Sequence, residues 1–185
     1  MAGVRQFDEE AALRRALEVF WEHGFHQTSM PDLASGTGVQ RGSLYHAYGG
    51  KEQIFLKAFE RFATAFLDGA AAALAGTDPR TSLFRFFDYC VESITTGSPS
   101  RGCLSTRTAV EADTPALQRA VRRLLDDLEN LVLESISGAD LTLRPREAAR
   151  LIVATTRALA VLERVYDDPR RLRETARSQV RTLLR

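Results

Sequence analysis

Apolar residues recur at helical spacing along almost the whole chain, whereas the alternation that is typical of strands never persists. The first helix is expected from about Asp8 to His23. Its buried face would include Leu13 and Phe20, and Gly24 would provide a left-handed stop. The pattern therefore predicts an all-α fold.

The next two predicted helices are short and are separated by a glycine-containing turn. Ser29 is expected to cap the first of them, with Asp32 as its partner in a capping box. The turn "GTGV" (36–39) then leads to a helix over 40–48, which completes a helix-turn-helix pattern. The other predicted helices are 51–74, 81–96, 103–113, 114–137, 145–166 and 169–185.

The helix over 40–48 carries hydrogen-bonding side chains and no acidic residue. Arg41 has the geometry to pair with guanine and Gln40 with adenine, while hydroxyls and cations at helix starts suit phosphate. Gly42 has no Cβ, so the backbone there can approach DNA closely. The residues predicted to contact DNA are Thr28, Ser29, Gln40, Arg41, Gly42, Ser43, Tyr45, His46 and Lys51.

Charge and composition confine this prediction to a local surface. The net charge of the 185 residues is +1, and the first fifty residues are slightly acidic. No apolar run is long enough to span a membrane, and two cysteines are too few for a disulfide framework, so we expect a cytoplasmic protein. No motif of a known catalytic type is present, and His23 and His26 have no third ligand nearby in sequence. We therefore expect no enzymatic activity, no metal and no cofactor.

The stretch "FWEHGFHQTSMPDLASGTGVQRGSLYHAYGGKEQIF" (20–55) resembles the helix-turn-helix of the TetR family of bacterial transcriptional regulators. Its run Gly42–His46 followed by Lys51 matches the family pattern, although Ala47–Tyr48 replaces the two aromatic residues that are more common there. The resemblance implies a DNA-binding domain over 1–50 and a helical ligand-binding and dimerisation domain over 51–185. It further implies a homodimer that binds a pseudo-palindromic operator, most often as a repressor released by a small-molecule effector. The alternative of a dimeric ligand binder that has lost DNA binding conflicts with the intact basic face from Arg41 to Lys51.

Seven of the ten phenylalanines lie between residues 55 and 87. Such a stripe fits an ordinary core, but an effector site also needs an apolar cavity with few polar groups. The residues predicted to line an effector site are Phe59, Phe62, Phe66, Phe87, Tyr89, Cys103 and Thr106.

Cys103 suggests a second way of sensing. It lies at a predicted helix start beside Arg101, in the segment "RGCLSTRTAVE", which resembles a segment of some TetR-family regulators. A cation and a helix start both lower the pKa of a thiol, so Cys103 could sense oxidants or electrophiles. A purely structural role at the helix start is the competing interpretation.

The last two predicted helices suit a dimer interface. The helix over 145–165 mixes small residues with leucine. The helix over 169–185 places arginines on one face and Leu172, Ala176, Val180 and Leu184 on the other. We expect the two helices from each subunit to form a four-helix interface.

Overall fold

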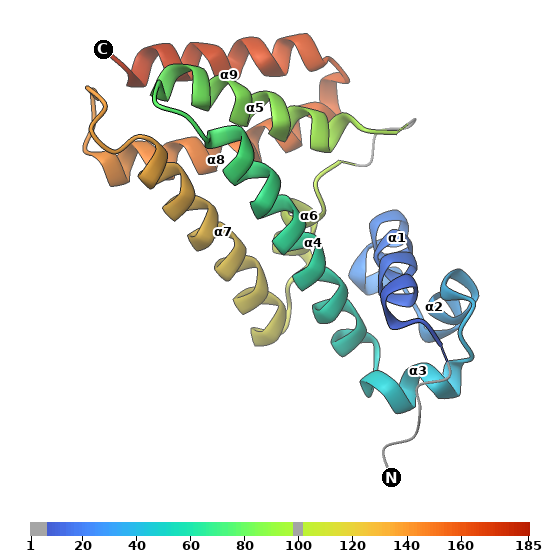
Figure 1. Cartoon of the computed structure of the whole chain (residues 1–185). Coiled ribbons are helices and arrows are strands. Elements are labelled where there is room, and N and C mark those ends of the chain that lie inside the picture. The colour runs from blue at the N-terminus through green and yellow to red at the C-terminus, as the bar shows by residue number, and fades with distance from the viewer. Residues whose placement is uncertain (1–6, 98–101) are drawn as a thin grey trace. The chain divides into compact units, whose positions relative to one another are not determined.

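The structure is a computed structural model that describes residues 7–97 and 102–185, and over these residues it consists of helices joined by loops (Figure 1). None of these helices is both long and apolar enough to cross a bilayer. The all-α prediction is confirmed, and every predicted helix is found with its bounds shifted by a few residues at most. The helices are α1 (Glu9–Gln27), α2 (Met30–Thr37), α3 (Arg41–Tyr48), α4 (Lys51–Leu74), α5 (Pro79–Thr95), α6 (Leu104–Glu111), α7 (Pro115–Ser135), α8 (Pro145–Tyr166) and α9 (Pro169–Leu183).

The chain divides into two compact units, and the division differs from the predicted boundary at residue 50. The first unit comprises Met1–Thr64 and Arg107–Val121. The second comprises Ala65–Thr106 and Arg122–Arg185. The first unit is larger than predicted because α4 continues without a break from Lys51, and its first half packs with α1.

Aromatic rings hold the core of the first unit together. The Phe20 and Phe55 rings meet edge to face with centroids 4.9 Å apart, and Phe25 meets Phe55 at 5.3 Å. Phe20 and Phe55 are fully buried. Edge-to-face pairs add to the free energy of burial itself, so these rings fix the end of α1 against the start of α4.

Helix α1 contains a sharp break at Gly24. Asp8 caps its start, as its Oδ1 accepts a hydrogen bond from the Ala11 N–H at 3.1 Å. Gly24 has φ 80° and ψ 170°, a conformation that is essentially restricted to glycine. Gly24 interrupts the regular helix with a positive φ, as predicted, but its ψ lies outside the left-handed helical region, and a single further turn carries the chain to Gln27.

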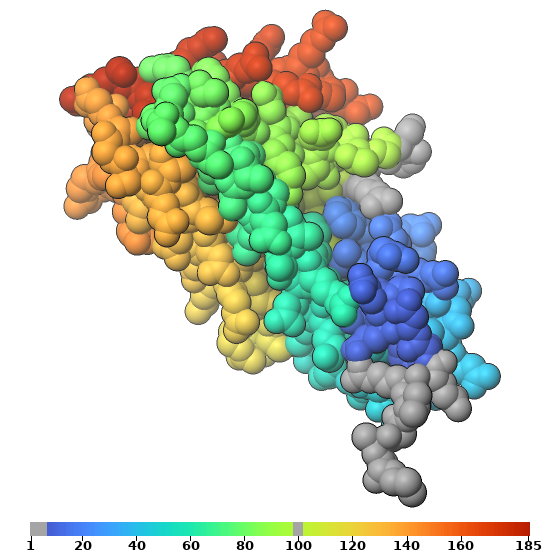
Figure 2. All heavy atoms as spheres, in the orientation of Figure 1, coloured from blue at the N-terminus to red at the C-terminus, as the bar shows by residue number. Residues whose placement is uncertain are grey.

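In the second unit, α5 packs along both α8 and α9. The atoms of α5 and α9 lie against each other along both helices in Figure 2. One part of the predicted dimer interface is wrong. The apolar residues of α9 are buried against other helices of their own chain and so are not available to a second copy. An amphipathic stripe shows that a face is covered without showing what covers it. The residues concerned are Leu172, Ala176, Val180 and Leu184.

Candidate nucleic-acid interface

Helix α2 begins with the predicted capping box. The Ser29 N–H donates to Asp32 Oδ2 at 2.8 Å, and Ser29 Oγ accepts from the Asp32 N–H at 3.3 Å. The side-chain and backbone hydrogen bonds from Ser29 lower the pKa of Asp32. Ser29 is exposed and still has access to phosphate, although its hydroxyl also donates to Asp32 Oδ2 at 2.6 Å.

The turn between α2 and α3 is fixed at three points. Gly38 takes the left-handed conformation with φ 72°. The Thr37 hydroxyl donates to the Leu33 carbonyl at 2.6 Å and accepts from the Val39 N–H at 3.2 Å. Arg15 of α1 donates to the Thr37 carbonyl at 3.1 Å. These contacts hold α3 at a set angle to α2, as a helix-turn-helix requires.

Helix α3 presents the predicted polar face. Leu44 and Tyr48 are buried, whereas Arg41, Tyr45 and His46 are exposed. The Arg41 guanidinium lies 5.6 Å from the centre of the Tyr45 ring. Gln40 and Gly42 are also exposed and Ser43 is half-buried, so six of the residues predicted to contact DNA keep access to solvent on or next to α3: Gln40, Arg41, Gly42, Ser43, Tyr45 and His46.

The position of Gly42 on this face is open. A Cβ built there would meet no other atom within 4 Å. Gln40 makes no side-chain hydrogen bond to cap α3. Among the described residues, the space beside Gly42 in the first turn of α3 is therefore open, which suits a helix that enters a groove of DNA.

Two of the predicted phosphate contacts are placed differently. Thr28 is 1% exposed, and its hydroxyl donates to the Gly24 carbonyl at 2.6 Å, so it does not lie on the surface. Lys51 reaches back to α1 instead of standing free at the start of α4. Its Nζ donates to the carbonyls of Phe25 at 2.8 Å and His26 at 3.3 Å. These acceptors lie at the end of α1, where carbonyl groups have no helical partner.

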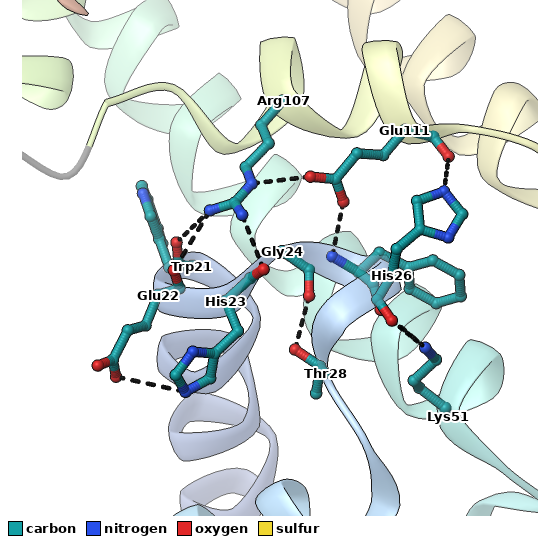
Figure 3. Close-up of polar contacts among 10 residues, drawn as sticks. Trp21, Glu22, His23, Gly24, His26, Thr28, Lys51, Arg107 and Glu111 are labelled. Carbon is teal, nitrogen blue, oxygen red and sulfur yellow. Dashed lines mark hydrogen bonds and ion pairs between the residues drawn. The ribbon is translucent and has the colours of Figure 1, made fainter.

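Two residues that the sequence did not single out complete this region (Figure 3). Arg107 of α6 donates to the carbonyls of Trp21 at 3.1 Å and His23 at 2.7 Å. Glu111 accepts from Arg107 Nε at 2.8 Å and from the Phe25 N–H at 2.7 Å. Apart from the resemblance of segment 101–111, the sequence offers only an i, i+4 pair of opposite charge here, and such pairs are common on solvent-exposed helices.

The residues predicted to line an effector site are divided between the two units. Phe59 and Phe62 belong to the first unit, where Phe59 stacks on Phe55 and Phe62 meets Trp21 at 5.3 Å. Phe66 and Tyr89 are neighbours in the second unit, with ring centroids 5.5 Å apart. The other predicted residues of the second unit are Phe87, which is buried, and the half-buried Cys103 and Thr106.

The Cys103 thiol lies in a polar, cationic environment. Its sulfur is 3.2 Å from Ser105 Oγ and 3.5 Å from Arg157 Nη1. Burial raises the pKa of this thiol, but the Arg157 charge and the hydrogen bonds of Ser105 and Thr106 together lower it below its ordinary value. Arg101, the cation named from the sequence, lies outside the described residues. Burial raises the pKa of Cys90 to about 12, which disfavours the reactive thiolate form of that core residue.

Comparison with known proteins assigns the family. Residues 12–58 match the family described as "Bacterial regulatory proteins, tetR family". The chain is 32% identical over 137 residues to the uncharacterized HTH-type transcriptional regulator YezE of Bacillus subtilis (strain 168), which covers 70% of this chain and 69% of YezE. It is 30% identical over 99 residues to the HTH-type transcriptional repressor ComR of Escherichia coli (strain K12), covering 52% and 47%.

A solved structure has the same fold along nearly the whole chain. It is a cysteine variant of the TetR family transcriptional regulator CifR complexed with 26-bp double-strand operator DNA. The TM-score is 0.78 at 24% identity, and the match covers 96% of this chain and 98% of that one. The helix-turn-helix, the all-helical fold and the match to YezE lead to one conclusion: the chain is a DNA-binding transcriptional regulator and belongs to the TetR family.

Proposed function

We propose that the protein is a homodimeric, effector-responsive repressor in the cytoplasm that binds a pseudo-palindromic operator through α3. The observation that carries this proposal is the face of α3, which is exposed, free of acidic residues and rich in groups that read base edges. Two copies related by a two-fold axis would place two α3 helices in successive major grooves. The name of ComR, a transcriptional repressor, supports repression.

The dimer is supported by an exposed apolar seam on α8. Leu151, Val161 and Val165 are 46%, 55% and 67% exposed. Ala154 and Ala158 between them are also exposed. The spacing of three and four residues is that of a helix that packs on a second helix, and the alanines permit close approach. Since the apolar side of α9 is buried, α9 would contribute its exposed polar side to the interface.

An effector in the second unit would act by favouring a dimer whose two α3 helices are wrongly spaced. The residues that we propose for its site are those predicted ones that lie in this unit. Phe66 and Tyr89 offer rings, and the Tyr89 hydroxyl donates to the Phe66 carbonyl at 3.2 Å. Cys103 and Thr106 of the same unit offer polar groups, and Cys103 packs against the buried core that contains Phe87.

Arg41→Ala should weaken binding to the true operator by about 1–3 kcal/mol, roughly 5- to 150-fold, if the guanidinium pairs with a base. Fluorescence anisotropy on the DNA upstream of the gene, with scrambled DNA for comparison and at two salt concentrations, measures this loss. Arg61→Ala is the matched control, because Arg61 is exposed on α4 of the same unit.

The pattern of the loss identifies the kind of contact. A loss confined to the operator indicates a base contact. An equal loss on both DNAs with a smaller salt dependence would make Arg41 a phosphate contact. Equal binding of the wild-type protein to operator and scrambled DNA would contradict the proposed function.

A second candidate function is thiol sensing through Cys103, and the lowered pKa beside Arg157 favours it. We predict that N-ethylmaleimide modifies Cys103 well before Cys90 at pH 7 and releases the operator. Arg157→Met should slow the modification, because it removes the charge that stabilises the thiolate. Mass spectrometry follows the modification, and Cys103→Ser is the control that should bind DNA and resist release. Full modification of Cys103 with unchanged operator affinity would exclude the sensor.

A further inference from the structure

Six successive carbonyl groups at the end of α1 each accept a hydrogen bond from a side chain. The Arg107 guanidinium donates to the carbonyls of Trp21, Glu22 and His23 at 3.1, 3.4 and 2.7 Å. The Thr28 hydroxyl donates to the Gly24 carbonyl. The Lys51 ammonium donates to the carbonyls of the next two residues, Phe25 and His26. Carbonyls at a helix end carry partial negative charge, so a guanidinium and an ammonium are suitable donors there.

The Arg107–Glu111 pair fills the space that a side chain at position 24 would occupy. A Cβ on Gly24 would lie 2.5 Å from Arg107 Nη2 and 2.6 Å from Glu111 Oε1. The backbone conformation of Gly24 and the position of this pair are therefore matched to each other. Figure 3 shows Arg107 and Glu111 extending from α6 over this turn.

Glu111 links the guanidinium to the turn that follows Gly24. One of its carboxylate oxygens accepts from Arg107 Nε and the other from the Phe25 N–H. Burial alone would raise the pKa of Glu111, but these hydrogen bonds and the Arg107 charge lower it below its ordinary value. The carboxylate is therefore charged at neutral pH and tied to the backbone on the far side of the Gly24 turn.

This turn leads directly into the elements that carry the DNA-binding face. Thr28 and the α2 cap Ser29 follow within five residues of Gly24, and Lys51 at the start of α4 binds the same turn. The positions where α2 begins and where α4 begins bracket α3 in the chain. Fixing the turn therefore fixes both connections of the helix-turn-helix to the rest of the first unit.

We propose that Arg107 and Glu111 are positioning residues for DNA recognition, acting through the Gly24 turn. The inference rests on the proposed function, since it assumes an operator. Preorganised binding elements lose less conformational entropy on binding, so loss of the pair should weaken operator affinity even where the unit stays folded.

The test uses Trp21, the single tryptophan of the chain, whose carbonyl the pair holds. Arg107→Ala is expected to raise acrylamide quenching of Trp21 and to weaken operator binding at least about tenfold, with helical content and dimer mass unchanged. Arg107→Lys keeps the positive charge but loses the several N–H donors of the guanidinium. Its Trp21 quenching and operator affinity should lie between those of the wild type and Arg107→Ala. Glu111→Gln should lose less operator affinity than Glu111→Ala, because the glutamine amide oxygen can still accept a hydrogen bond from the Phe25 N–H.

Ile54→Val is the control for a merely structural role, since Ile54 is buried in the core of the same unit and lies outside the pair. It should lower the denaturation midpoint with little effect on operator affinity. A loss of affinity that follows the loss of stability equally in Ile54→Val and Arg107→Ala would overturn the positioning role, as would an unchanged affinity in Arg107→Ala. If the wild-type protein binds no operator, the proposed function fails, and unchanged Trp21 quenching in Arg107→Ala would then overturn the pair's hold on the turn.

Discussion

Gly24→Ala is expected to destabilise the first unit by about 2–4 kcal/mol, because strain and collision add. An alanine at φ 80° and ψ 170° adopts a conformation that costs on the order of 1–3 kcal/mol. Its Cβ would also displace the Arg107–Glu111 pair, since both partners lie within 2.6 Å of the methyl position. Displacement removes donors from three carbonyls of α1 at once. Urea denaturation followed by Trp21 fluorescence measures the loss in this unit.

Gly49→Ala separates the two contributions. Gly49 belongs to the same unit and has φ 87°, but a Cβ there meets no atom within 4 Å. This variant should show the cost of a left-handed backbone without a collision, about 1–2 kcal/mol. Equal losses in the two variants would mean that the Arg107–Glu111 pair moves aside freely and contributes little to the turn.

Val161→Glu is expected to convert the proposed dimer to monomers and to abolish tight operator binding. Val161 lies in the middle of the exposed α8 seam, and a two-fold interface would bring one new carboxylate from each copy. An unpaired charge that loses its water costs several kcal/mol, so the dimer dissociation constant should rise at least about 100-fold. Sedimentation equilibrium measures the dimer, and anisotropy on the operator measures the loss of two-site binding.

Val110→Glu provides the matched substitution. Val110 is 86% exposed on α6 and lies outside the α8 seam. It should leave both the dimer and the operator affinity in place. A dimer of Val161→Glu as stable as the wild-type dimer would show that the interface lies elsewhere, and the α8 seam would then need another explanation.

The helix-turn-helix could be predicted because its signals are local. The capping box of Ser29 and Asp32, the glycine turn and the polar face of α3 each depend on residues within a few positions of one another. The helix bounds followed for the same reason. The apolar side of α9 was predicted to pack on a second copy, but it packs within its own chain. The periodicity of Leu172 and Val180 predicts that they are buried but does not indicate which helices bury them.

The contacts at the end of α1 could not be predicted, because they join distant parts of the chain. Arg107 and His23 are 84 residues apart in sequence. The place of Lys51 at a helix start predicts a phosphate contact, which stays a prediction, but nothing in the sequence shows that its Nζ also donates to carbonyls of α1. Thr28 was misplaced, as nothing in the sequence shows that its hydroxyl turns inward to Gly24.

The discontinuous make-up of the first unit has a consequence for biosynthesis and for recombination. At about 5–20 residues per second, Arg107 leaves the ribosome roughly 4–17 seconds after the α1 turn that it caps. During this interval the carbonyls of Trp21, Glu22 and His23 in the nascent chain lack the hydrogen bonds that Arg107 later donates. A gene fusion cut after residue 50 or residue 64 would transfer α3 without the Arg107–Glu111 pair, which belongs to the same unit. A chimera that exchanges DNA specificity between such regulators should therefore carry residues 107–121 along with the N-terminal segment.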